Sequence, residues 1–164
     1  MEKVLYMGLT ANGCYAVVDE SHSESSLPKE VPDNFTQQVR RIGNLIIGRR
    51  TYELFHTKMP GIRLLIVSRS HPTYNGVSVV ASPVEALSLL EKEGFDTALV
   101  GGGATLVNTV LSQGLIDEIY TNIYPSISNG RTFAISEKLE SNLELLSVAK
   151  LGADVVQLHY RVRR

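Results

Sequence analysis

The chain has 164 residues, 43% of them hydrophobic and 20% charged, which suits one globular domain with a substantial core. Its net charge of −1 gives no electrostatic reason to expect binding to nucleic acid or to an anionic membrane. No apolar run is long enough to span a membrane, and Met1 leads directly into a strand-like stretch, so we expect no signal peptide. The single cysteine, Cys14, cannot form an internal disulfide, and a cytoplasmic protein is therefore expected.

Short apolar runs alternate along the chain with stretches of helical periodicity. Strands are expected at 4–9, 45–47, 64–67, 77–80, 98–100 and 119–123, with helices beginning near residues 33, 49, 83 and 104. The clearest helix start is Ser82-Pro83-Val84-Glu85, which combines an N-cap serine, a proline at the first helical position and a glutamate three residues after the cap. The polar segment 19–32 is predicted to be a loop and is a candidate lid.

The last part of the chain has the period of strands. Residues 143–149 and 155–162 are predicted to form a β-hairpin, and one face of its second strand is far more apolar, with Val156, Leu158, Tyr160 and Val162. Alternating strands and helices imply a mostly parallel sheet that is covered on both faces. We therefore predict a single α/β domain over residues 1–164, with three α/β/α layers and an antiparallel hairpin at its C-terminal end.

Three glycines stand between a predicted strand and a predicted helix. Gly101, Gly102 and Gly103 follow the apolar run 98–100, and Ala104 opens the next helix. Glycine lets the backbone turn sharply, and the N–H groups at a helix start favour an anion. The pattern indicates a turn that holds the phosphates of a dinucleotide, although a plain tight turn is the alternative.

Two further polar clusters also follow predicted strands. Gly48-Arg49-Arg50-Thr51 comes after the strand at 45–47, and Ser68-Arg69-Ser70 comes after the strand at 64–67. Guanidinium groups and hydroxyls bind phosphate well, and ligands of open α/β sheets bind outside the carboxyl ends of the strands. Both clusters therefore favour a phosphate site, with solvated surface charges as the alternative. The first strand lacks a following GxGxxG run, which argues against an ordinary dinucleotide-binding fingerprint.

In order and spacing, four runs resemble the dihydrofolate reductase fold family across nearly the whole chain. These runs are Gly48-Arg49-Arg50-Thr51-Tyr52-Glu53, Met59-Pro60-Gly61, Ile66-Val67-Ser68-Arg69 and Val100-Gly101-Gly102-Gly103. The stretch 114–119, followed by Pro125, is more similar to the branch of riboflavin-pathway reductases, the RibD C-terminal-domain type.

This resemblance implies NADPH as hydride donor, with the nicotinamide near Met7 and Gly8. It implies a cis peptide bond at Gly101-Gly102 and a homodimer through the hairpin or the strand at 115–125. The adenosine 2′-phosphate would be surrounded by Arg49, Arg50, Ser68 and Arg69. The pyrophosphate would be held by Thr51, Gly101, Gly102, Gly103, Ala104 and Thr105, with Gly48 at the turn before them.

Dihydrofolate reductases carry a carboxylate at the start of the first helix, facing the substrate. Depending on the alignment, the matching residue here is Asp33 or Asn34. Asparagine cannot act as a proton-donating acid, whereas Asp33 could, or it could serve only as a charge in the first helical turn. The chain has no tryptophan, although one is common beside the pteridine site of that family.

We therefore expect NADPH-dependent reduction of a small heterocyclic or ribosylaminopyrimidine substrate. The alternatives are a dihydrofolate reductase, an NADPH-binding protein without catalysis, and an interaction protein whose site is unused. A ribose phosphate on the substrate would need a cation, for which Lys29, Lys58 and Arg131 are candidates. No metal site is expected, because the histidines lack ligand spacing and no HxE with a later CxxC indicates an attached zinc deaminase.

Overall fold

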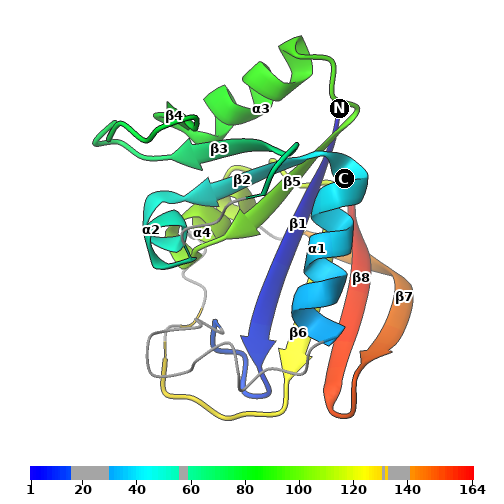
Figure 1. The fold of residues 1–164 in the computed structure, drawn as a ribbon. Helices are drawn as coiled ribbons and strands as arrows, with labels where there is room; N and C mark the ends of the chain where they lie inside the picture. Colours follow the sequence, from blue (N-terminus) through cyan, green and yellow to red (C-terminus); the bar gives the residue numbers. More distant parts are fainter. Residues whose placement is uncertain (16–29, 56–58, 131, 133–140) are drawn as a thin grey trace.

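The computed structural model describes residues 1–15, 30–55, 59–130, 132 and 141–164. Within these residues, eight strands form one sheet in the order β4-β3-β2-β5-β1-β6-β8-β7 (Figure 1). The antiparallel pairs of this sheet are β6 with β8 and β8 with β7, and the other neighbouring strands are parallel. The strands are β1 Glu2–Thr10, β2 Asn44–Gly48, β3 Arg63–Val67, β4 Ser78–Val80, β5 Thr97–Gly102, β6 Glu118–Tyr124, β7 Asn142–Leu151 and β8 Val155–Arg163. The helices are α1 Glu30–Ile42, α2 Arg49–Phe55, α3 Pro83–Lys92 and α4 Ala104–Ser112.

Neighbouring residues of the parallel strands point to opposite faces of the sheet, and helices cover both faces. On one face, Val39 of α1 packs in a cluster with Val4 and Leu99. On the other face, α3 and α4 pack against a second cluster that includes Leu5 and Val100. The three predicted layers are therefore present, and the mostly parallel sheet with its antiparallel hairpin is confirmed.

The start of α3 follows the predicted capping pattern. The Ser82 hydroxyl accepts a hydrogen bond from the Glu85 backbone N–H at 3.1 Å, and the Glu85 carboxylate accepts one from the Ala81 N–H at 2.8 Å. Side chains thus satisfy N–H groups that the helix itself leaves without acceptors.

The chain leaves β1 and β5 in opposite directions, although these two strands are neighbours. From β1 it passes through α1 to β2, and from β5 it passes through α4 to β6, with the two helices on opposite faces of the sheet. In an open α/β sheet this arrangement creates a crevice outside the carboxyl ends of the two strands. The fold therefore places the candidate site beside Thr10 and Gly102.

At the start of β8, the more apolar face is not the buried one. Val155 is fully buried and Gln157 is 6% exposed, whereas Val156 is 38% exposed. The reason is that Val31 of α1 packs against Val155 at this end of β8, whereas on the more apolar face it is Val162, at the other end of the strand, that packs against the central cluster. Apolar side chains exposed on the hairpin are Leu143, Leu145, Val148 and Val156.

The homodimer stays a prediction, which sedimentation of the purified chain would test. None of the described helices is long and apolar enough to cross a membrane.

Candidate cofactor and substrate site

The glycine turn is shorter than its three residues indicate. Strand β5 remains paired with β2 through Gly102, and α4 begins at Ala104 with Gly103 as its N-cap. Gly102 has φ +120°, a backbone conformation that residues with a Cβ rarely adopt. The cis peptide bond joins Gly102 and Gly103, so its prediction at Gly101-Gly102 is wrong. Strand β5 ends at Gly102, two residues beyond the predicted strand at 98–100, so the chain leaves the sheet later than predicted.

The turn has close neighbours on both sides. A Cβ on Gly103 would lie 2.8 Å from the Thr51 hydroxyl oxygen, and one on Gly102 would lie 2.6 Å from the Tyr15 hydroxyl oxygen. The backbone therefore approaches two hydroxyl groups more closely than any side chain would allow. No side-chain hydrogen bond caps α4 at Gly103, so the first N–H groups of that helix, from Ala104 and Thr105 onward, lack a capping acceptor, and the Thr51 hydroxyl lies beside the cap residue. Such a donor set fits a phosphate.

Cationic and hydroxyl side chains follow the carboxyl ends of β2, which pairs with β5, and of β3, which pairs with β2. Strands β5, β2 and β3 are parallel neighbours, so their carboxyl ends lie at one edge of the sheet, where α2 and the start of α4 meet (Figure 1). Arg49 and Arg50 open α2 directly after β2. Ser68, 7% exposed, lies 3.0 Å from Ser70 between their hydroxyl oxygens, and Arg69 between them is exposed. The structure thus brings all three predicted clusters to one edge.

An acidic side chain that sequence reasoning did not single out, Glu53, contacts one of these cations. The Glu53 carboxylate is 3.4 Å from the Arg49 guanidinium and accepts a hydrogen bond from the Tyr74 hydroxyl at 2.6 Å. The ring of Tyr74 lies against that of Tyr52, with centroids 4.7 Å apart. This contact joins α2 to the segment that follows β3.

The two candidate acids of α1 occupy different surroundings. Asp33 is exposed in the first turns of the helix, whereas Asn34 points into the protein. The amide oxygen of Asn34 accepts hydrogen bonds from the Tyr6 hydroxyl at 2.9 Å and from the Gln157 amide at 3.0 Å. An exposed carboxylate in the first turn is what the structural alternative for Asp33 predicts.

Tyr6, Asn34, Asn122 and Gln157 form a polar network from four elements, β1, α1, β6 and β8. The Asn122 side chain is fully buried, donates to the Tyr6 hydroxyl at 3.0 Å and accepts from Gln157 at 2.9 Å. Burial raises the pKa of Tyr6 to about 12, although hydrogen bonds from Asn122 and Gln157 act to lower it. All four side chains are therefore uncharged at neutral pH. Sequence reasoning missed three of them, and the one signal was an asparagine inside the apolar run 119–123.

Two more tyrosines lie near the ends of β1 and β5. A Cβ on Gly8 would overlap the ring of Tyr124, so this ring lies across the backbone where the nicotinamide is predicted. Burial raises the pKa of Tyr15 to about 12 and also raises that of Tyr124. Two largely buried, neutral tyrosine side chains therefore lie beside Gly8 and Gly102.

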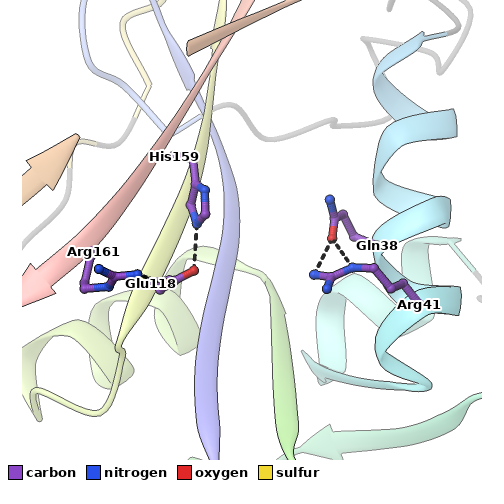
Figure 2. A network of polar contacts seen from close by, with 5 residues as sticks. All are labelled: Gln38, Arg41, Glu118, His159 and Arg161. Atoms are coloured by element: carbon purple, nitrogen blue, oxygen red, sulfur yellow. Dashed lines mark hydrogen bonds and ion pairs between the residues drawn. The ribbon is translucent and has the colours of Figure 1, made fainter. Parts of the chain in front are cut away.

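Other predicted features lie elsewhere in the molecule or outside the described residues. Lys29, Lys58, Arg131 and most of the candidate lid at 19–32 are not among the described residues. His159 contacts Glu118 at 2.7 Å at the start of β6, where Arg161 also contacts Glu118, away from the glycine turn (Figure 2). Gln38 and Arg41 form a separate contact on α1 in the same view. In the described part of the chain, no group of side chains could hold a metal ion.

The model of the RibD C-terminal domain family matches residues 57–157. The chain belongs to this family. It is 23% identical over 149 residues to the uncharacterized protein YyaP of Bacillus subtilis, with 79% of each chain covered. Its fold is similar to that of a proposed riboflavin biosynthesis protein from Shewanella, with a TM-score of 0.80, 19% identity and both chains fully covered. A pyrimidine reductase-like protein from Corynebacterium diphtheriae has a TM-score of 0.79 and 16% identity, with 99% of this chain and 92% of that one covered.

Proposed function

We propose that the chain is a reductase of the RibD type that uses NADPH to reduce a small heterocyclic substrate, with a ribosylaminopyrimidine as the first compound to test. Reductase domains of this family typically bind a nicotinamide cofactor. The observation that carries the proposal is the meeting of the Gly103 turn, Thr51 and the clusters after β2 and β3 at one edge of the sheet.

The residues at this edge can be assigned to the two phosphate groups of NADPH, the pyrophosphate and the adenosine 2′-phosphate. The N–H groups at the start of α4, with the Thr51 hydroxyl, would hold the pyrophosphate. Further out, Arg49, Arg50 and Arg69, with the Ser68 hydroxyl, would hold the adenosine 2′-phosphate, because a guanidinium offers paired donors to phosphate oxygens. Since only NADPH carries that phosphate, these arginines favour it over NADH.

Bound NADPH supplies the hydride, and the chain supplies position and surroundings. Tyr124 and Tyr15 would line the pocket of the nicotinamide ring. The amide nitrogen of Asn34, which donates no hydrogen bond to another described residue, would donate to a carbonyl or ring nitrogen of the substrate. Asn34 cannot titrate, and Tyr6 with a pKa of about 12 is a weak acid, so this network orients the substrate rather than protonating it. Protonation would then come from solvent.

The deciding experiment measures NADPH oxidation in the presence of two substrates. We expect turnover of the aminopyrimidine of the riboflavin pathway and none of dihydrofolate, because Asn34 supplies no carboxylate to a pteridine. Turnover of dihydrofolate alone would contradict the proposal. NADPH binding without turnover of either compound would favour the non-catalytic alternative.

A further inference from the structure

Glu53 places a negative charge among the residues proposed to bind the 2′-phosphate. Its carboxylate contacts Arg49 at 3.4 Å from one turn further along α2, and both side chains are less than half exposed. The same carboxylate oxygen accepts the Tyr74 hydrogen bond at 2.6 Å, which raises the pKa of the Tyr74 hydroxyl. Glu53 therefore links Arg49 to Tyr74, in the segment that follows the Ser68-Arg69-Ser70 cluster.

The charge of Glu53 matters to a bound anion more than to the helix. An exposed pair at this spacing stabilises a helix by only about 0.3–0.5 kcal/mol. A phosphate bound to Arg49, by contrast, would carry a charge of about −1.5 to −2 close to the same carboxylate. A carboxylate beside the adenosine ribose favours NADH, because it accepts from the 2′-hydroxyl and repels a 2′-phosphate.

We propose that Glu53 is a specificity-determining residue that limits the preference of this site for NADPH over NADH. The inference rests on the proposed cofactor function. Glu53 holds the guanidinium of Arg49 when no phosphate is bound, and its charge opposes the phosphate when one is bound. NADH lacks the group that this charge opposes.

Two substitutions separate the charge of Glu53 from its structural role. Glu53→Gln removes the charge but keeps an oxygen that accepts from the Tyr74 hydroxyl. Tyr74→Phe removes that hydrogen bond but keeps the carboxylate and the ring against Tyr52. Glu144→Gln on β7, at the far edge of the sheet, removes one charge from a side chain that is 41% exposed, close to the 44% of Glu53.

The experiment measures the dissociation constants of NADPH and NADH for each variant by nicotinamide fluorescence. Removing one nearby like charge should make Glu53→Gln bind NADPH about 3- to 10-fold more tightly, a gain that shrinks from about 0.05 M to about 0.5 M salt. NADH affinity should change less than about twofold, because it lacks the phosphate. Tyr74→Phe and Glu144→Gln should keep the wild-type ratio of the two affinities.

Three results would overturn the inference. The first is an equal change for both cofactors in Glu53→Gln, and the second is the same shift in the Glu144→Gln control. The third is an unchanged ratio in Glu53→Gln when Arg49→Ala selectively weakens NADPH, which leaves the proposed cofactor function standing. If the wild-type chain binds neither cofactor, the proposed function itself fails, and the inference fails with it.

Discussion

Two groups of polar side chains lie toward the carboxyl ends of the parallel strands, and they differ in charge and in burial. The cluster after β2 and β3 is cationic and largely open to solvent, with Arg49 42% exposed on its side chain. The network around Asn122 is neutral and enclosed, and Asn122 itself is fully buried. A charged group can stay near water until it meets a phosphate, whereas a buried polar group must be satisfied by the fold itself.

The two groups of side chains should therefore have different roles, the arginines in binding and the amide network in folding. The exposed arginines contribute little to the folded state, so substitutions there should change cofactor affinity and leave stability intact. The amide network joins β1, α1, β6 and β8, so substitutions there should change stability first. A substitution with both effects, or with the effects exchanged, would contradict this division.

The largest effect is expected for Asn122→Leu. The leucine removes two hydrogen bonds of the buried network, the one donated to the Tyr6 hydroxyl and the one accepted from the Gln157 amide, and each contributes about 0.5–1.5 kcal/mol. We expect the free energy of unfolding in urea to fall by about 2–3 kcal/mol. Gln37→Leu on the exposed side of α1 is the matched control and should change it by less than about 0.5 kcal/mol. A loss below about 1 kcal/mol for Asn122→Leu would mean that the network is not needed for the fold.

Next in size is the loss of a proposed phosphate ligand. Hydrogen bonds to charged groups are worth about 1.5–3 kcal/mol, so Arg49→Ala or Arg69→Ala should weaken NADPH binding about 10- to 100-fold. NADH binding and the urea midpoint should stay near their wild-type values. Calorimetric titration with each cofactor would measure the difference. An equal loss for the two cofactors would remove these arginines from the 2′-phosphate site.

A smaller effect, on the free energy of unfolding, is expected at Asp117, which is a charged and partly buried side chain. Its carboxylate contacts Lys3 at 2.8 Å and Arg164 at 2.6 Å. Burial acts to raise the pKa of Asp117, but hydrogen bonds from the side chain and backbone of Lys3, with both positive charges, lower it overall.

A pKa that is lower in the folded state stabilises the protein above the ordinary pKa of aspartate, and this contribution is lost as the pH falls through the folded value. Asp117→Asn should therefore cost about 1 kcal/mol at pH 7, and the difference from wild type should narrow as the pH falls below about 4. Urea unfolding as a function of pH would measure it. A difference that grows toward low pH would have the wrong sign.

The meeting of the three polar clusters at one edge could be predicted because its signals are local. Each cluster directly follows an apolar strand, and adjacent parallel strands bring such ends together, so residues 48–51, 68–70 and 101–103 meet at one edge. The predicted position of the cis bond was wrong by one residue. The end of β5 depends on the register in which Ile47 of β2 pairs with Gly102, and the sequence pattern does not predict that register.

The buried polar network of Tyr6, Asn34, Asn122 and Gln157 could not be assembled from the sequence. Asn122 and Gln157 are 35 residues apart and meet only through the antiparallel register of β6 and β8. Gln157 alternates with Val156 and lies on the face that the pattern marks as polar, yet Val155 and Gln157 on that face are buried because α1 packs against them. Long-range strand pairing and the position of α1 therefore determine which polar side chains are buried together, and sequence periodicity alone does not predict this.

The most direct test of the central claim is a titration of the wild-type chain with NADPH and with NADH, followed by nicotinamide fluorescence. If the edge formed by Gly103, Thr51 and the arginines holds a dinucleotide with a 2′-phosphate, NADPH should bind at least about tenfold more tightly than NADH, since one charged hydrogen-bond set is worth about 1.5–3 kcal/mol. Equal affinities would contradict the assignment of the arginines, and the absence of binding to either cofactor would contradict the site as a whole.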